Sequence, residues 1–321
     1  MSQAITQQPA AARALFPDAT TIIDAPESRF PLKLGIENRR IRELYRMATA
    51  KQWDPQKAIP WSKLDPSRYT AEQLWAARMY WSRRAWGEYG AISESPALQI
   101  RFCQQKHESD LRFFFTLRTQ EESRHAEACY LMAEKLGGYI EAPVQTAFQG
   151  SVATHGVRKM ALDLDTPLEA IIASLVCAAE EIAFDVFGHL IKITREPVAR
   201  KVLQLITRDE VRHCAFGWAY MEKRIPLLTP RELEGVEQAV VTMIEKVEMN
   251  GYHSAWLGPD SPATRGEMEA DRITWEAGLG ATVEELEKPV FVKTIKRLRR
   301  QMQPWGFTLK QFSHPKIDGA F

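Results

Sequence analysis

Two segments with the same five-residue pattern constrain the fold of this chain more than any other feature of its sequence. Both read acid-Glu-x-Arg-His: Glu-Glu-Ser-Arg-His ends at His125, and Asp-Glu-Val-Arg-His ends at His213. Residues three positions apart share a helix face, so Glu122 can meet His125 at one metal ion, as Glu210 can meet His213. A single Glu-x-x-His is usually a solvated surface pair, but only these two of the seven histidines carry it with the same flanking acid and arginine. Carboxylate and imidazole groups together suit iron or manganese.

The surrounding sequence predicts an all-α fold. Helical patterning is widespread, and the alternation of β-branched residues that indicates strands is nearly absent. Thr70 can cap the first long helix, and Pro96 inside it is expected to mark a break or a kink. The predicted helices cover residues 36–50, 71–105, 109–136, 166–194, 196–224, 229–249 and 285–302.

Two of the four longest predicted helices carry the doubled motif, so the other two must supply the remaining ligands. A ferritin-like four-helix bundle with two metal ions takes one Glu-x-x-His from each of two helices and one Glu from each of the others. The first long helix offers Glu88, with Glu94 as the second choice, and the third offers Glu180 or Glu181. We favour Glu180, because apolar neighbours such as Phe184 would give a dry pocket for oxygen chemistry. The candidate ligands are therefore Glu88, Glu122, His125, Glu180, Glu210 and His213.

Charged residues beside the motifs are predicted to support the ligands. A ligating histidine usually donates its other N–H to a carboxylate, which fixes its tautomer. Glu121 and Asp209 are expected to do this, each for the histidine of the opposite motif. Arg124 and Arg212 would neutralise these acids, and Glu181 completes the outer set. The alternative interpretation is that these residues form ordinary surface ion pairs.

An arginine precedes Glu88 by one helical turn. Arg84 shares a face with Glu88, where an unpaired guanidinium would be costly to bury. One interpretation gives it a structural partner, Glu181 or Asp185 on the third long helix. The other gives it a substrate carboxylate, bound through two parallel hydrogen bonds, and makes Arg84 a candidate catalytic residue.

Composition narrows the classes of partner and location. The 321 residues include 42 basic and 41 acidic side chains, which gives no reason to expect nucleic acid or a membrane as a partner. The sequence shows no run of 18 apolar residues, no signal-peptide pattern and no CxxC pair among its four cysteines, so we expect a cytoplasmic protein. Residues 1–35 are predicted to form a flexible arm, 36–255 the di-metal helical domain, and 256–321 a helical extension packed on that domain.

The motifs resemble those of bacterial di-iron monooxygenase hydroxylases, such as the enzymes for methane and toluene. The likeness lies in Gly87-Glu88-Tyr89-x-Ala91-Ile92, in Glu122-x-x-His125 followed by Cys129, and in Asp209-Glu210-x-Arg212-His213. Residues 180–184 and 205–210 also resemble the ribonucleotide reductase small subunit, and the arylamine N-oxygenases share the doubled motif. Together these resemblances cover residues 71–220.

The resemblance implies a non-haem di-iron oxygenase, with manganese as the alternative metal, that uses dioxygen to hydroxylate or N-oxygenate a small organic substrate. It also implies a homodimer. No flavin, nicotinamide or iron–sulfur motif is visible, so the electrons are expected from a separate donor protein. The alternatives are an iron-oxidising or peroxide-reducing relative of ferritin and rubrerythrin, and a radical-generating reductase-like subunit.

Two positions depart from the patterns of these families. Cys129 stands where the reductases carry their radical tyrosine, which argues against a tyrosyl radical there, and the methane enzyme has a cysteine at the same position. We therefore count Cys129 with Arg84 and Phe184 among the candidate catalytic residues. Ile206 stands where the N-oxygenases have an additional metal-binding histidine.

Overall fold

The computed structural model describes residues 33–143 and 157–321. Residues Ile36–Phe321 belong to one compact unit. Almost all of the predicted flexible arm, residues 1–35, lies outside the described residues. Within the described ranges the chain is helical throughout, apart from turns and one isolated bridge between His314 and Ile317. No helix in this part of the chain combines the length and the apolar character needed to span a membrane.

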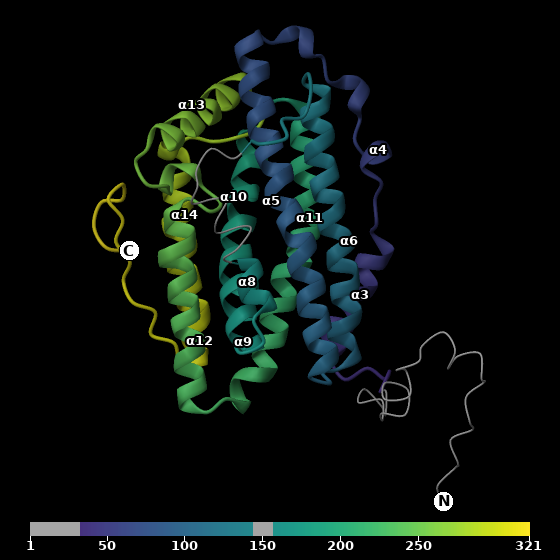
Figure 1. The fold of residues 1–321 in the computed structure, drawn as a ribbon, viewed down its shortest axis with the longest axis vertical. Helices are drawn as coiled ribbons and strands as arrows, with labels where there is room; N and C mark the ends of the chain where they lie inside the picture. Colours follow the sequence, from purple (N-terminus) through teal and green to yellow (C-terminus); the bar gives the residue numbers. More distant parts are fainter. Residues whose placement is uncertain (1–32, 144–156) are drawn as a thin grey trace, which may run out of the picture. The chain divides into compact units, whose positions relative to one another are not determined.

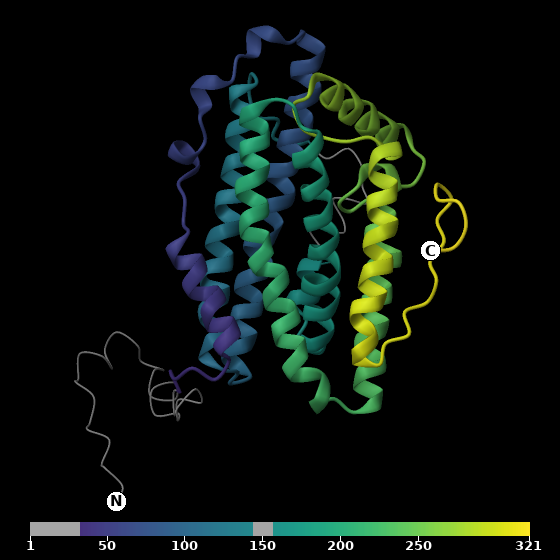
Figure 2. The same cartoon turned by 180° about the vertical axis from the view of Figure 1, so that it is seen from behind.

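Four long helices form the bundle that was predicted. They are α5 (Ala71–Gln104), α6 (Ser109–Lys135), α10 (Glu180–Ile193) and α11 (Pro197–Arg224). Helix α5 packs on α6, α6 on α11, and α11 on α10, and Figures 1 and 2 show the four running side by side. This is an all-α, ferritin-like four-helix arrangement.

Shorter elements surround this core. Before the bundle come α3 (Arg39–Ala50), α4 (Pro55–Ala58), η1 (Trp61–Lys63) and η2 (Pro66–Arg68). Between α6 and α10 lie α8 (Val157–Leu162), α9 (Leu168–Ile171) and the π-helical η4 (Ile172–Ala179). After α11 follow η5 (Ile225–Leu227), α12 (Pro230–Thr242), the π-helical η6 (Met243–Val247), η7 (Glu248–Asn250), η8 (Ala255–Leu257), α13 (Pro262–Ala277), α14 (Glu284–Met302) and η9 (Gln303–Trp305). Helix α14 packs on α10 and α13 packs on α5, so both cover the bundle.

The ends of the long helices follow from local sequence. Thr70 and Gln73 form a reciprocal capping box at the start of α5. Glu196 accepts a hydrogen bond from the backbone of Ala199 at the start of α11. The predicted break at Pro96 is wrong, because α5 continues to Gln104 with the proline inside it. Packing along the whole of α6 outweighs the one backbone hydrogen bond that a proline removes.

Apolar packing is divided into two buried clusters, and a segment with many polar side chains separates them on α5, α6 and α11. On α6, Phe114 and Phe115 belong to one cluster, and Cys129 and Met132 belong to the other. The segment between them carries both Glu121 and the first Glu-x-x-His motif. The corresponding segments are 86–96 on α5 and 207–215 on α11, whereas on α10 Glu180 stands between Ala179 and Ile182 of the first cluster. Charged residues therefore gather at one level of the bundle because each helix places them there.

A glycine allows α11 to approach the π-helical segment just before Glu180. A Cβ at Gly217 would lie 2.9 Å from Cys177 Sγ and 2.9 Å from Val176 Cγ1. Any larger side chain would push the two helices apart. Gly217 thus sets the distance between α11 and the start of α10, and with it the spacing between Glu210 and Glu180.

Candidate metal centre

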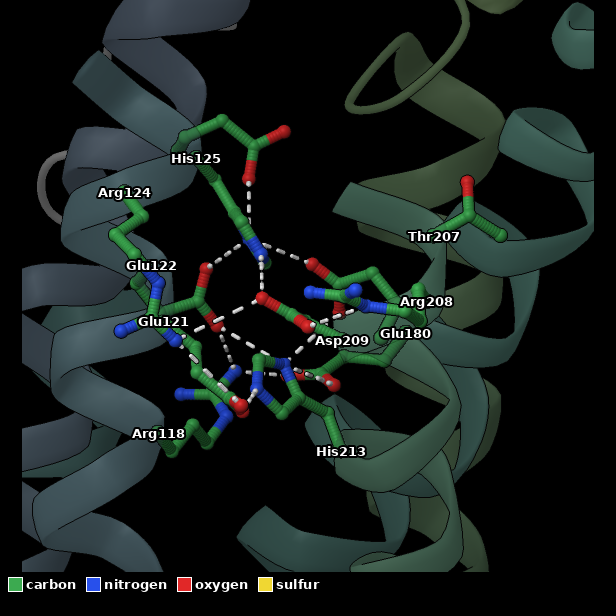
Figure 3. A network of polar contacts seen from close by, with 12 residues as sticks. Arg118, Glu121, Glu122, Arg124, His125, Glu180, Thr207, Arg208, Asp209 and His213 are labelled. Carbon is green, nitrogen blue, oxygen red and sulfur yellow. Dashed lines mark hydrogen bonds and ion pairs between the residues drawn. The ribbon is translucent and has the colours of Figure 1, made fainter. Parts of the chain in front are cut away.

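The six candidate ligands lie together at the level of these polar segments. Figure 3 shows the side chains of α6, α10 and α11 converging there, and Glu88 joins them from α5. Two sets of donor atoms are close enough to hold an ion, each set having its atoms within 4.8 Å of one another. The first set is Glu88, Glu122, His125 and Glu210, and the second is Glu122, Glu180 and His213.

Two carboxylates join the sets, because each reaches both histidines. Glu122 places Oε2 3.5 Å from His125 Nδ1 and Oε1 3.2 Å from His213 Nδ1. Glu210 places Oε1 3.0 Å from His125 Nδ1 and Oε2 2.9 Å from His213 Nδ1. Glu88 approaches only His125, at 3.7 Å, and Glu180 approaches only His213, at 3.8 Å. The arrangement is that of two neighbouring sites with two shared carboxylates and one terminal carboxylate each.

The outer nitrogen of each histidine meets the acid of the other motif. His125 Nε2 lies 3.4 Å from Asp209 Oδ2, and His213 Nε2 lies 3.0 Å from Glu121 Oε2. Both acids are fully buried, and Arg212 pairs with both. These contacts leave Nδ1 of each ring directed at the ligand carboxylates, so α6 and α11 orient each other's histidines.

Two further residues belong to this network and were missed in the sequence. Trp53, from the irregular segment between α3 and α4, donates from Nε1 to Asp209 Oδ2 at 2.7 Å. Arg118 lies one turn before Glu122 and is buried between Glu122 and Glu180, with its guanidinium 3.1 Å from Glu122 Oε1. Arg124, which was predicted to neutralise the outer acids, approaches Asp209 and Glu121 only to 3.7 Å.

The histidines carry the electrostatic signature of a strongly anionic centre. Burial alone would lower the pKa of His125, but its contacts with Asp209, Glu122 and Glu210 raise that pKa well above the usual value. Burial is likewise outweighed at His213, where Glu210 and Glu122 raise the pKa well above the usual value. The site therefore favours positive charge at both Nδ1 atoms.

The carboxylates differ among themselves. Burial raises the pKa of Glu180 to about 7, against the opposing effect of Arg118. Glu122 is as deeply placed, but Arg118 and His213 hold its pKa well below the usual value. The pKa of Glu210 falls to about 2 in spite of burial, mainly because of His213. Glu180 is thus the ligand candidate that most readily takes up a proton.

The structure separates the two neighbouring glutamates of α10. Glu180 faces His213, whereas Glu181 accepts hydrogen bonds from Trp218 Nε1 at 2.7 Å and from Arg297 of α14 at 2.6 Å. The placement of Glu181 beside the histidines' supporting acids is therefore wrong. Asp185 also pairs with Arg297, at 2.8 Å. Neither Glu181 nor Asp185 is therefore the structural partner of Arg84 that the first interpretation expected.

Two of the three candidate catalytic residues do not line the cavity beside the site. On α10 the cavity wall is formed by Glu180, Ala183 and Phe187, at spacings of three and seven residues. Phe184, four residues after Glu180, turns toward the side that carries Glu181 and is absent from the wall. Cys129 is fully buried in the apolar cluster below α5, and burial raises the pKa of its thiol.

The cavity itself has a volume of about 380 Å³ and reaches the candidate ligands. Its wall includes Glu88, Glu122, Glu180 and Glu210 at one end. Arg84, the third candidate catalytic residue, also lines it. A cavity of this size is in the range that holds small organic molecules.

The donor set fits two divalent ions. Among the described residues, His125 Nδ1 and Glu180 Oε2 are buried without a well-directed hydrogen bond, although Glu210 Oε1 lies 3.0 Å from the first and His213 Nδ1 lies 3.8 Å from the second, and each belongs to one of the two sets. Unsatisfied buried polar atoms are costly, and a metal ion at each set would use them. Four carboxylates balance the charge of two divalent ions, and carboxylate with imidazole suits iron or manganese.

Comparison with known proteins agrees with the architecture. No protein-family model and no curated protein sequence matches this chain. Among solved structures, a tyrosine-to-phenylalanine mutant of an R2-like ligand-binding oxidase with anaerobically reconstituted Mn/Fe cofactor has a TM-score of 0.66 at 15% identity, covering 81% of this chain and 93% of that chain. A valine-to-alanine mutant with the same cofactor has a TM-score of 0.65 at 17% identity, over 81% and 93%. A glycine-to-phenylalanine mutant with aerobically reconstituted Mn/Fe cofactor has a TM-score of 0.63 at 15% identity, over 83% and 98%.

This chain has the fold of the R2-like ligand-binding oxidases. In this chain the four long helices contribute the two histidines and four carboxylates described above.

Proposed function

We propose that this protein is a non-haem di-iron oxygenase, with manganese as the alternative metal, that oxidises a small organic substrate with dioxygen. The observation that carries the proposal is the pair of donor sets that share Glu122, together with Glu210 of the first set, which also contacts His213 of the second. Solved structures that share the fold of this chain are described as oxidases with an Mn/Fe cofactor, which supports the same class of chemistry. When bound, two such ions supply electrons for the reduction of dioxygen.

The protein's own residues would orient the ligands and exclude water. Asp209 and Glu121 hold the outer N–H of each imidazole, which fixes the Nδ1 lone pair toward the centre. Arg118 and Arg212 neutralise buried carboxylate charge. Apolar side chains of α10 line part of the cavity wall and would limit the contact of water with a reactive centre.

The cavity favours an oxygenase over an iron-storage protein, because its volume and the apolar side chains that α10 contributes to its wall suit a small organic molecule. The proposal includes a small organic substrate, a separate electron-donor protein, a homodimeric assembly and a cytoplasmic location. Hydroxylation and N-oxygenation both remain within it.

The test is a stoichiometric reaction with iron and oxygen. Metal-free protein is loaded anaerobically with two equivalents of Fe(II) and mixed with oxygenated buffer, while stopped-flow absorption and oxygen uptake are recorded. The proposal predicts oxidation much faster than that of free Fe(II), and loss of this acceleration in the His125→Ala/His213→Ala double variant. The His253→Ala variant, which removes a histidine outside the cluster, is the matched control for metal oxidation.

Excess Fe(II) separates the two classes of protein. An oxygenase stops after its bound ions are oxidised and resumes only when a reductant is added. Continued oxidation of all added iron into a mineral would identify an iron-storage protein. Oxidation at the rate of free Fe(II) would contradict the proposal entirely.

A further inference from the structure

Helix α14 has a strongly basic outer face. Residues 288–302 of this helix contain six basic side chains and no acidic one, although the net charge of the whole chain is only +1. Lys293, Lys296 and Arg300 are exposed at spacings of three and four residues, so they form one stripe, which we call the α14 basic face. In the described part of the chain, no carboxylate lies within 4.0 Å of any of the three.

The other basic residues of α14 are held by contacts within the chain. Lys288 pairs with Glu284 at 2.8 Å. Arg299 donates to three backbone carbonyls of the segment that follows the helix. Arg297 reaches inward and pairs with α10. The charge of the α14 basic face is therefore not used in holding the fold, and it can attract an acidic partner.

The inner side of the same helix leads to the candidate metal centre. Lys293 lies one turn before Arg297, whose guanidinium reaches Glu181 Oε2 at 2.6 Å. Glu181 is buried and directly follows Glu180, whose carboxylate lies 3.8 Å from His213 Nδ1. Arg297 and Glu181 thus connect the α14 basic face to a candidate metal ligand.

Two tryptophans connect the same contact to the surface beside α14. Trp218 of α11 donates from Nε1 to Glu181 Oε1 at 2.7 Å, and its ring centre lies 4.9 Å from that of Trp305. Trp305 belongs to η9, which directly follows α14, and it is partly exposed. Electron tunnelling weakens steeply across gaps between atoms, so touching rings and a short hydrogen bond favour it. The path ends beside Glu180.

We propose that a small acidic one-electron carrier protein docks on the α14 basic face and delivers electrons to the metal centre through Trp305, Trp218 and Glu181. The docking does not depend on the proposed function, whereas the delivery of electrons rests on it. Each transfer oxidises the carrier by one electron and reduces one ferric ion to ferrous, with no bond made or broken. A single helix face is small, which suits the weak and transient complexes of electron carriers.

The first experiment measures docking without oxygen chemistry. The probe is an acidic two-iron, two-sulfur ferredoxin in its oxidised form, titrated into zinc-loaded protein by calorimetry. Wild-type protein should bind it with an affinity that decreases as salt is added. The triple variant Lys293→Glu/Lys296→Glu/Arg300→Glu should bind it at least about 10-fold more weakly, with unchanged helix content and zinc content.

A matched control reverses three exposed charges elsewhere. Arg39→Glu/Arg46→Glu/Lys51→Glu changes the net charge by the same amount on and just after α3, which lies on the other side of the bundle from α14 (Figures 1 and 2). At an ionic strength of about 0.1 M, exposed charges more than about 10 Å apart are largely screened, so this variant should bind ferredoxin like the wild type.

Three results would overturn the docking site. The first is absence of binding by the wild type. The second is an equal loss of affinity in the α3 and α14 variants, because attraction would then follow net charge rather than one face. The third is binding of polyglutamate as tight as that of ferredoxin, which would identify a general polyanion surface. If the reversed α14 variant fails to fold, Lys293→Gln/Lys296→Gln/Arg300→Gln replaces it and should lose part of the affinity.

The second experiment follows the electrons. Reduced ferredoxin is mixed with oxidised, iron-loaded protein under anaerobic conditions, and stopped-flow absorption gives the transfer rate. Trp305→Leu should slow transfer by an order of magnitude or more while the zinc-loaded form keeps its affinity for ferredoxin. Trp75→Leu, which removes an exposed tryptophan of α5, should leave the rate unchanged. An unchanged rate in Trp305→Leu would overturn the path. Docking on α14 in a protein that does not accelerate iron oxidation would support this surface and refute the proposed oxygenase separately.

Discussion

Metal binding should release protons from this site, and the structure sets how many. At pH 7 the metal-free protein holds an extra proton on both His125 and His213, because their pKa values lie well above the usual value. An ion binds the neutral imidazole, so each Nδ1 proton must leave while the Nε2 contact stays. Glu180, with a pKa of about 7, is half protonated and contributes about half a proton more. The expected release is about 2.5 protons for two ions.

The sign of the pH dependence follows from this count. Protons compete with metal ions, so the combined affinity for two ions should rise by roughly 300-fold per pH unit near pH 7. Release should increase as the pH falls below the pKa of Glu180, near 7, and decrease as the pH rises above it.

Calorimetry in several buffers measures the released protons directly. Zinc is titrated into metal-free protein at fixed pH in buffers of different ionisation enthalpy, and the slope of the observed enthalpy against that quantity gives the proton count. A release below one proton at pH 7 would show that both imidazoles are neutral before binding. The electrostatic description of the centre would then be wrong.

Four substitutions test the individual roles in the site. His125→Ala and His213→Ala should each reduce metal content while circular dichroism shows unchanged helix, and full metal retention in both would make the motifs ordinary helix-face pairs. Asp209→Ala should weaken metal binding about 10- to 100-fold, because it acts through the orientation of His125, and chelator competition measures this. An unchanged affinity would remove Asp209 from the supporting network. Arg118→Met should lower the free energy of unfolding of the metal-free protein by about 3–5 kcal/mol, because it leaves Glu122 buried without its partner. Urea unfolding should show a smaller loss with zinc bound, and equal losses in the two forms would refute the neutralising role.

The parts of the site that obey helix periodicity could be predicted from the sequence. Glu122 and His125 are three residues apart on one helix, so their proximity depends on local geometry alone. Placing Glu88 and Glu180 near them required the bundle topology as well, and the structure brings both to the same level.

The missed residues fall into two kinds. Arg118 had a usable signal, because it precedes Glu122 by four residues, the same spacing that singled out Arg84 before Glu88. Trp53 had none, because it lies in an irregular segment and meets Asp209 only after the chain has folded. Phe184 was misplaced because the residue four positions after Glu180 was expected to face the pocket. The structure instead places the residues three and seven positions after Glu180 on the cavity wall, and the rotation of α10 decides between these spacings.

Helix α13 was not among the helices predicted from the sequence, although both of its ends carry local signals. Its start has a cap, since Ser261 accepts from the backbone of Thr264, and Gly278 in a left-handed conformation ends it. Three of its four buried residues, Thr264, Glu267 and Thr274, are not apolar, so the buried face does not appear as an apolar stripe in the sequence.

Elemental analysis of the protein tests the central claim most directly. The chain is purified without added metal, loaded anaerobically with Fe(II) or Mn(II), freed of excess ions and measured for metal per chain, beside the His125→Ala/His213→Ala double variant as control. The account predicts two ions per chain in the wild-type protein and a large loss in the variant. One ion or none in correctly folded wild-type protein would contradict a centre built from two donor sets that share Glu122.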